Sequence, residues 1–198
     1  SEFSEQHDIL IISHELYEMM TYEGDYVSFL GDYENVIGIN SFSKTFAMTG
    51  WRIGYLAARK EWIKELCKVN YYNIACPPNP SQHAILYALK NRLDFVEQMN
   101  DTFEKRRNII VDRLNDIDGF NCLKPKGAFY VFPSFDFDVT SKDLAIKFLK
   151  DNVLAIPGSA FGPTGEGHIR FSYANSTENI NKAMDIIEEI VKNLEIKN

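Results

Sequence analysis

SFSKTFAMTGWRIGY, residues Ser41 to Tyr55, is the most informative segment of the chain. It follows a short apolar run at 36–39, which predicts a buried strand. Lys44 therefore lies on the loop after a strand end, where open α/β sheets bind their ligands. Arg52 follows on the same stretch, and its planar guanidinium is suited to binding a phosphate through two parallel hydrogen bonds.

The chemistry of this stretch suits a phosphorylated aldehyde. A lysine amine attacks an aldehyde only in its neutral form, which burial or a nearby cation favours, and Arg52 is the candidate cation for Lys44. Ser41 and Ser43 add short hydroxyl donors on the same loop, and Gly50 leaves room for close backbone approach. The alternative is that Lys44 is a solvated lysine in a surface loop.

The segment closely resembles the pyridoxal-phosphate lysine motif of class I aminotransferases, the fold-type I enzymes related to aspartate aminotransferase. The resemblance implies that the cofactor is pyridoxal 5′-phosphate and that Lys44 is the catalytic lysine that forms a Schiff base with it. It also implies that Ser41 and Arg52 hold the cofactor phosphate, with Ser43 as a further contact.

Upstream, residues 8–13 (DILIIS) predict another buried strand, followed by HELYE at 14–18. Tyr17 matches the family's tyrosine whose phenol bonds the ring oxygen of the cofactor; the alternative is an ordinary half-buried tyrosine. His14 stands where the family has an aspartate beside the pyridine nitrogen. A neutral imidazole favours the protonated ring much less than a carboxylate does, so the resemblance implies slower or different chemistry if His14 occupies that site. The alternative is a histidine that ends the strand and points elsewhere.

Three downstream segments also resemble the family: KGAFYVFP at 126–133, VLAIPGSAFG at 153–162 and GHIRFSYA at 167–174. The last is similar to the segment whose arginine binds the α-carboxylate of the substrate. The resemblance therefore implies that Arg170 is a substrate-binding residue, which would orient the α hydrogen toward Lys44. The alternative is an exposed arginine on an alternating strand.

The pattern along the chain predicts two domains. Residues 1–97 are expected to form the carboxy-terminal part of a large α/β domain that binds the cofactor, with a mixed, mostly parallel sheet covered on both faces. Residues 98–198 are expected to form a small α+β domain that closes over the substrate. The family resemblance also implies that the chain begins roughly where the family's second half begins, so it is expected to be the carboxy-terminal half of a longer enzyme. Predicted strands are 8–13, 36–40, 53–58, 128–133, 153–156 and 168–173; predicted helices are 60–69, 81–89 (capped by Ser81), 92–114, 141–151 and 176–194.

Composition limits the partners. The 198 residues are 45% hydrophobic and 25% charged with a formal charge of −7, typical of a globular protein and unfavourable for binding nucleic acid or an anionic membrane. The three cysteines, Cys67, Cys76 and Cys122, lack metal-ligand spacing, and they indicate reduced thiols of a cytoplasmic protein. No metal site is expected.

The resulting expectation is an aminotransferase fragment that moves an amino group between an amino acid, aspartate in our interpretation, and 2-oxoglutarate. The family resemblance implies a homodimer for the full-length protein, and the fragment alone is expected to be inactive. Two alternatives stay open. One is a carbon–sulfur lyase of the same fold, for which His14 is an argument, and the other is a non-catalytic domain that senses the cofactor.

Overall fold

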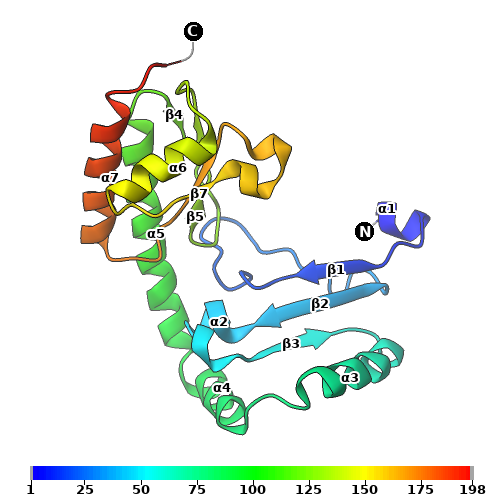
Figure 1. The fold of residues 1–198 in the computed structure, drawn as a ribbon. Coiled ribbons are helices and arrows are strands. Elements are labelled where there is room, and N and C mark those ends of the chain that lie inside the picture. Colours follow the sequence, from blue (N-terminus) through cyan, green and yellow to red (C-terminus); the bar gives the residue numbers. More distant parts are fainter. Residues whose placement is uncertain (1, 197–198) are drawn as a thin grey trace. The chain divides into compact units, whose positions relative to one another are not determined.

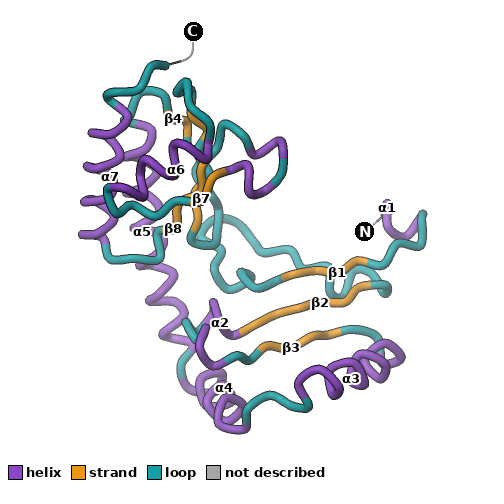
Figure 2. The backbone as a smooth tube through the Cα atoms, viewed as in Figure 1, coloured by secondary structure: helices purple, strands orange, loops and turns teal. Residues whose placement is uncertain are grey.

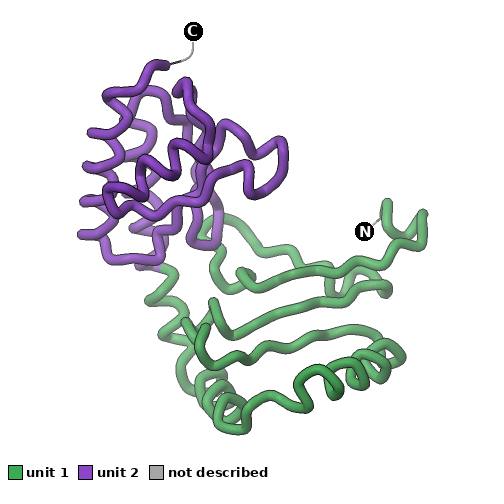
Figure 3. Tube along the Cα trace, in the orientation of Figure 1, with its two compact units in different colours: residues 1–100 green, residues 101–198 purple. Residues whose placement is uncertain are grey.

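The computed structural model describes residues 2–196 and divides into two compact units, Ser1–Asn100 and Asp101–Asn198 (Figure 3). The boundary predicted between residues 97 and 98 lies close to this division. Helix α5 (Leu93–Asn115) runs across it. Each unit has a hydrophobic core of its own, so each is described separately.

A three-stranded sheet organises the first unit (Figures 1 and 2). Strand β1 (Ile11–His14) pairs in parallel with β2 (Val36–Ser41), which places His14 opposite Ile39. Strand β3 (Gly54–Ala57) pairs with β2 in the antiparallel direction, which places Gly54 opposite Ser41. The unit is therefore an α/β unit with a mixed sheet.

One face of this sheet is open to solvent. Side chains alternate between the two faces of a strand, and the register puts Ile12, Ile39 and Leu56 on one face. Ile12 is 64% exposed and Leu56 is 40% exposed. The expectation that both faces are covered is therefore wrong for the described residues, since an apolar strand sequence shows only that a face can be buried.

Helices flank the sheet in the first unit. Helix α3 begins at Lys60, as predicted, and continues to Ile74, whereas α4 begins at Asn79 after Pro78. The prediction that Ser81 caps α4 is wrong, because a proline near the first helical position starts this helix and leaves Ser81 buried inside its first turn. The complete helical elements of this unit are α1 (Glu2–Gln6), α2 (Phe42–Thr45), the 3₁₀ turn η1 (Thr49–Trp51), α3 (Lys60–Ile74) and α4 (Asn79–Asn91).

The second unit combines small antiparallel sheets with helices around a larger core. Strand β8 (Ile169–Ser172) lies between β5 (Tyr130–Val131) and β7 (Ile156–Pro157), and β4 (Phe120–Asn121) pairs with β6 (Ser134–Phe135). Helices α6 (Ser141–Lys150) and α7 (Thr177–Val191) contribute fully buried Leu144, Phe148 and Ile187 to the core. The strands are shorter than predicted, and β4 and β6 were not anticipated because two-residue strands leave no periodicity to detect.

Charged side chains recur along every long helix in the described part of the chain, and none of these helices has a stretch long and apolar enough to cross a membrane.

Candidate functional site

The sheet of the first unit brings three chain segments to one edge (Figure 1). The parallel strands β1 and β2 end there at His14 and Ser41, and the antiparallel strand β3 begins there at Gly54. Lys44 follows β2 directly, and Arg52 precedes β3. The carboxyl edge of parallel strands is where open α/β sheets bind ligands, so the topology gathers the predicted cofactor-binding residues at a suitable place.

The lysine lies on a short capped helix. Ser41 is the N-cap of α2, and its Oγ accepts a hydrogen bond from the backbone N–H of Ser43 at 3.1 Å. The two hydroxyl oxygens are 2.9 Å apart, and Ser41 Oγ also lies 3.1 Å from the carbonyl oxygen of Ile53, to which it donates. Lys44 itself is half-buried. The serines thus fix the turn that carries Lys44 and tie it to the segment before β3.

Buried side chains and a hydrogen bond hold the loop between Lys44 and Arg52 in place. Phe46, Met48 and Ile53 are buried in one hydrophobic cluster with Ile85 of α4 and Val96 of α5. In addition, the buried hydroxyl of Ser81 donates to the carbonyl oxygen of Trp51 at 2.8 Å. The sequence did not predict this role of Ser81, because no local pattern reveals a contact made thirty positions away.

Arg52 adopts an uncommon backbone conformation. Its φ of 51° and ψ of 51° lie in the left-handed region, which few residues other than glycine occupy. The exposed side chain donates through Nη1 to the carbonyl oxygen of Thr49 at 3.0 Å. Arg52 also lines a pocket of about 430 Å³ between β3 and α3, and none of the other predicted cofactor-binding residues lines that pocket. Strained residues of this kind cluster at functional sites.

His14 and Tyr17 flank a buried carboxylate. His14 ends β1 with an exposed side chain, and Tyr17 lies half-buried on the following turn. Between them, Glu15 is 3% exposed and accepts hydrogen bonds from Ser13 and Ser28 at 2.8 and 2.7 Å. Burial raises the pKa of the Glu15 carboxyl, but these hydrogen bonds and others from the 26–29 segment outweigh it, and the net pKa is lowered. Sequence reasoning gave Glu15 no role.

Arg170 lies in the second unit, on the central strand β8. Arg170 is half-buried, and its guanidinium carbon lies 4.6 Å from the centre of the Tyr130 ring and 4.8 Å from that of Phe161. Among the residues that the structure describes, no carboxylate lies within ion-pair distance of it. The structure therefore groups the six other predicted site residues in the first unit and places Arg170 in a setting of its own.

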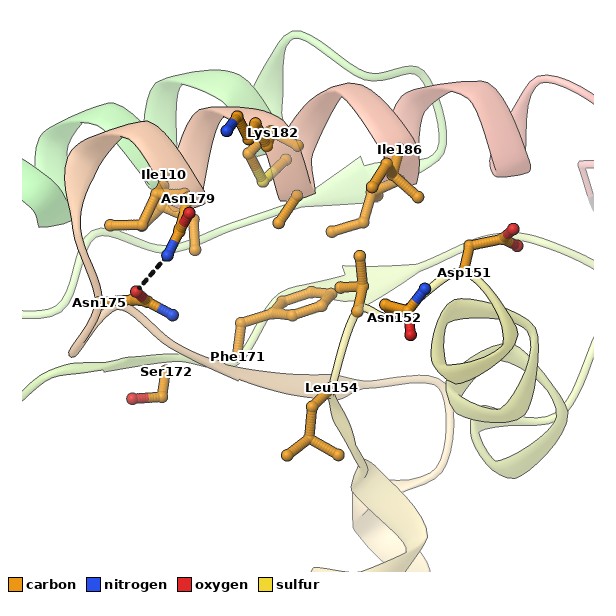
Figure 4. Close-up of a pocket in the computed structure, with 15 residues that line it drawn as sticks. Ile110, Asp151, Asn152, Leu154, Phe171, Ser172, Asn175, Asn179, Lys182 and Ile186 are labelled. Atoms are coloured by element: carbon orange, nitrogen blue, oxygen red, sulfur yellow. Dashed lines mark hydrogen bonds between the residues drawn. The ribbon is translucent and has the colours of Figure 1, made fainter.

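A further hollow in the second unit contains none of the predicted site residues (Figure 4). It lies between β8 and α7, with Phe171 and Ile186 along its apolar side. At its polar rim, Asn179 Nδ2 donates to Asn175 Oδ1 at 3.0 Å. Asp151, Ser172 and Lys182 also line it, but Lys182 Nζ is bonded to Glu178 at 2.7 Å, and we assign no chemistry to the hollow.

These features define an α/β protein that presents a lysine, hydroxyls and an arginine at the carboxyl edge of its sheet. The chain belongs to the class I and II aminotransferase family, whose sequence model matches residues 1–187. Pyridoxal 5′-phosphate is the cofactor of this family.

Similar proteins include aromatic-amino-acid aminotransferase 2 of Thermococcus litoralis, 41% identical over 97% of this chain and 51% of the relative. The aspartate aminotransferase of Pyrococcus abyssi is 40% identical with the same coverage. Among solved structures, the aromatic aminotransferase of Pyrococcus horikoshii superposes with a TM-score of 0.91 at 41% identity, over 96% of this chain and 53% of that one. The chain thus spans about half the length of the curated relatives it matches. That the second unit is the small carboxy-terminal domain of such an enzyme stays a prediction.

Proposed function

We propose that this chain is part of a pyridoxal-phosphate-dependent aminotransferase, and that Lys44 is its catalytic lysine. The observation that supports this most directly is the position of Lys44, on a capped helix directly after the carboxyl end of β2. The similar proteins are named aminotransferases and transaminases, which favours amino-group transfer over carbon–sulfur cleavage or cofactor sensing.

The donor set at the sheet edge fits this cofactor. Arg52 offers a guanidinium, and Ser41 and Ser43 offer hydroxyls, the groups that bind a phosphate ester. Tyr17 offers a phenol for the ring oxygen, and Lys44 offers the amine that an aldehyde requires. Hydrogen bonds and a buried cluster already fix the backbone that carries these donors, so that backbone does not have to be ordered anew when a ligand binds. The Ser41 hydroxyl would exchange its bond to the Ile53 carbonyl oxygen for one to the phosphate.

The residues then have separate tasks. When bound, the cofactor supplies an aldehyde and an electron-accepting ring. Lys44 Nζ would accept the proton that leaves the α carbon of the substrate and would deliver it to the carbon of the cofactor's aldehyde group, which is general acid–base catalysis by one amine. Arg170 binds the α-carboxylate through its guanidinium and so fixes the orientation of the amino acid.

His14 modifies the proposed chemistry. A carboxylate beside a pyridine nitrogen stabilises the protonated ring, whereas an imidazole shares a hydrogen bond without supplying a negative charge. We therefore expect transamination to be slower than in relatives that carry an aspartate there, and we expect His14→Asp to raise the rate.

For the substrates we propose aspartate and 2-oxoglutarate, with aspartate supported by the names of several similar proteins. Other names point to aromatic amino acids, so the rates with aspartate and phenylalanine should be compared directly. The family resemblance also supports a cytoplasmic homodimer for the full-length protein.

A labelling experiment tests the role of Lys44. The purified chain is mixed with pyridoxal phosphate and reduced with borohydride, and mass spectrometry locates the pyridoxyl group. We expect it on the peptide that contains Lys44, and we expect Lys44→Ala to abolish that label. Lys64→Ala, which removes an exposed lysine from α3, is the matched control and should change nothing. Label scattered over several lysines would contradict the proposal.

A comparison of two aldehydes tests Arg52. Pyridoxal phosphate and pyridoxal differ only in the phosphate, so a residue that binds the phosphate affects only the first. Arg52→Ala should weaken binding of pyridoxal phosphate by about tenfold or more, since hydrogen bonds to charged groups contribute roughly 1.5–3 kcal/mol. Binding of pyridoxal should stay unchanged; an equal loss for both aldehydes would show that Arg52 only shapes its loop.

A further inference from the structure

Arg170 differs from Arg107 and Arg113 of its unit in the groups that its guanidinium contacts, and it resembles Arg106, whose guanidinium carbon lies 5.6 Å from the centre of the Phe103 ring. Arg107 is fully buried and donates to Glu104 at 3.0 Å, and Arg113 lies 2.6 Å from Asp185. Arg170 has two aromatic rings instead and, within the described chain, no acidic partner. A carboxylate partner would neutralise the guanidinium and compete with a carboxylate ligand. An aromatic face attracts the cation without occupying its N–H donors.

Two different elements supply the rings. Tyr130 lies on β5, where it faces Ser172 of β8, so it is the diagonal neighbour of Arg170 on the same face of the sheet. Phe161 ends the 3₁₀ turn η2 (Gly158–Phe161), which follows directly after β7, the other neighbour of β8. The guanidinium is thus contacted by residues from both sides of its strand.

The turn that carries Phe161 is itself fixed. Gly158 and Gly165 approach so closely that a Cβ added to Gly158 would lie 1.9 Å from the carbonyl oxygen of Gly165. Next to this contact, Ser141 Oγ donates to a carboxylate oxygen of Glu166 at 2.8 Å and accepts from the backbone N–H of Ser159 at 3.3 Å. Since Ser141 is fully buried, the position of η2 is determined by the core of the unit.

We infer that Tyr130 and Phe161 are positioning residues that hold the guanidinium of Arg170 in place while leaving its N–H donors available for a carboxylate. This inference rests on the proposed role of Arg170 in binding the α-carboxylate. The inference adds two residues, Tyr130 and Phe161, that do not contact the substrate themselves. They affect how strongly Arg170 binds it. Phe161 is 50% exposed, so its replacement should leave the fold intact.

The test combines binding with a direct view of the guanidinium. The 198-residue chain is titrated with 2-oxoglutarate, and the Nε–H signal of Arg170, assigned by its loss in Arg170→Lys, is followed by NMR. Ring currents should shift this signal in the wild type. Phe161→Leu should remove part of the shift and weaken 2-oxoglutarate binding by about twofold to fivefold, the fold-change that a cation–π contact of 0.5–1 kcal/mol implies. Phe161→Tyr should restore both, and Tyr130→Leu should act like Phe161→Leu.

The controls separate two kinds of failure. Phe29→Leu removes a ring of similar exposure from the first unit and should leave affinity and signal unchanged. If Arg170→Lys binds 2-oxoglutarate as well as the wild type, or the wild type does not bind it, the proposed role of Arg170 fails and the inference fails with it. If Arg170→Lys abolishes binding while both leucine variants bind normally, only the inference is overturned.

Discussion

Replacing Glu15 by glutamine should destabilise the first unit in a pH-dependent way. Glu15 is a buried carboxylate whose Oε1 accepts from Ser13 Oγ at 2.8 Å and from the Phe29 N–H at 3.3 Å. Its Oε2 accepts from Ser28 Oγ at 2.7 Å. The side chain therefore ties the long segment before β2 to the end of β1, next to His14.

The expected loss follows from these contacts. A hydrogen bond to a charged group contributes about 1.5–3 kcal/mol, and glutamine keeps one oxygen as an acceptor while losing the charge. We expect Glu15→Gln to lower the free energy of unfolding by roughly 2 kcal/mol at neutral pH. Because folding lowers the pKa of Glu15 below its usual 4.5, its contribution is complete above that value. The contribution is lost as the pH falls through the lower folded-state pKa.

Tryptophan fluorescence offers a readout for this unit alone, since both tryptophans of the chain, Trp51 and Trp62, lie in it. Urea unfolding followed by this signal should show a wild-type advantage over Glu15→Gln at pH 7 that shrinks toward pH 3. Glu97→Gln, which changes an exposed carboxylate on α5, should unfold like the wild type throughout. A difference that is independent of pH would refute the reasoning, because it would arise from shape and not from charge.

Two further predictions concern the second unit. Burial raises the pKa of the Cys122 thiol to about 11. At pH 8 a thiol reagent should therefore modify the exposed Cys67 and Cys76 quickly and Cys122 only after unfolding. Equal modification rates for all three cysteines would contradict this prediction. Gly165→Ala should unfold at much lower urea than the wild type, since its Cβ would lie 2.1 Å from the carbonyl oxygen of Gly158. Circular dichroism measures this, and an unchanged midpoint would show that the turn can shift without cost.

The local sequence predicted the helices and strands on which the site residues lie. It did not predict the side-chain contacts that fix those residues. The apolar run before Ser41 predicted β2, and the helix beginning at Lys60 and the long helix α5 were also predicted. Each of these three elements has a clear hydrophobic periodicity in its sequence or a clear residue at its boundary. The family resemblance, and not the periodicity, supplied the roles of Lys44 and Arg52, because a period shows where a side chain lies without showing what it binds.

The missed features have a common physical cause. Ser81 was predicted to cap a helix, yet its hydroxyl holds the loop before Arg52. Glu15, for which no role was predicted, is buried among serines. Phe161, for which no individual role was predicted, contacts Arg170. Each of these roles depends on a partner distant in the chain, and nothing in the local composition encodes that partner.

Lys44 and Arg170, the two proposed substrate-site residues, are held in place by different contacts. Changes to those contacts should therefore have different kinetic effects. Lys44 is fixed through its backbone, by the Ser41 cap and by the buried cluster that packs against its loop. Arg170 is fixed at its guanidinium, by the rings of Tyr130 and Phe161. Given the proposed roles of Lys44 and Arg170, replacing the ring of Tyr130 or Phe161 should raise KM for the substrate with little effect on kcat. Changes to the buried cluster that supports the loop of Lys44 should lower kcat. Separate supports would thus allow the affinity for the carboxylate and the reactivity of the amine to vary independently.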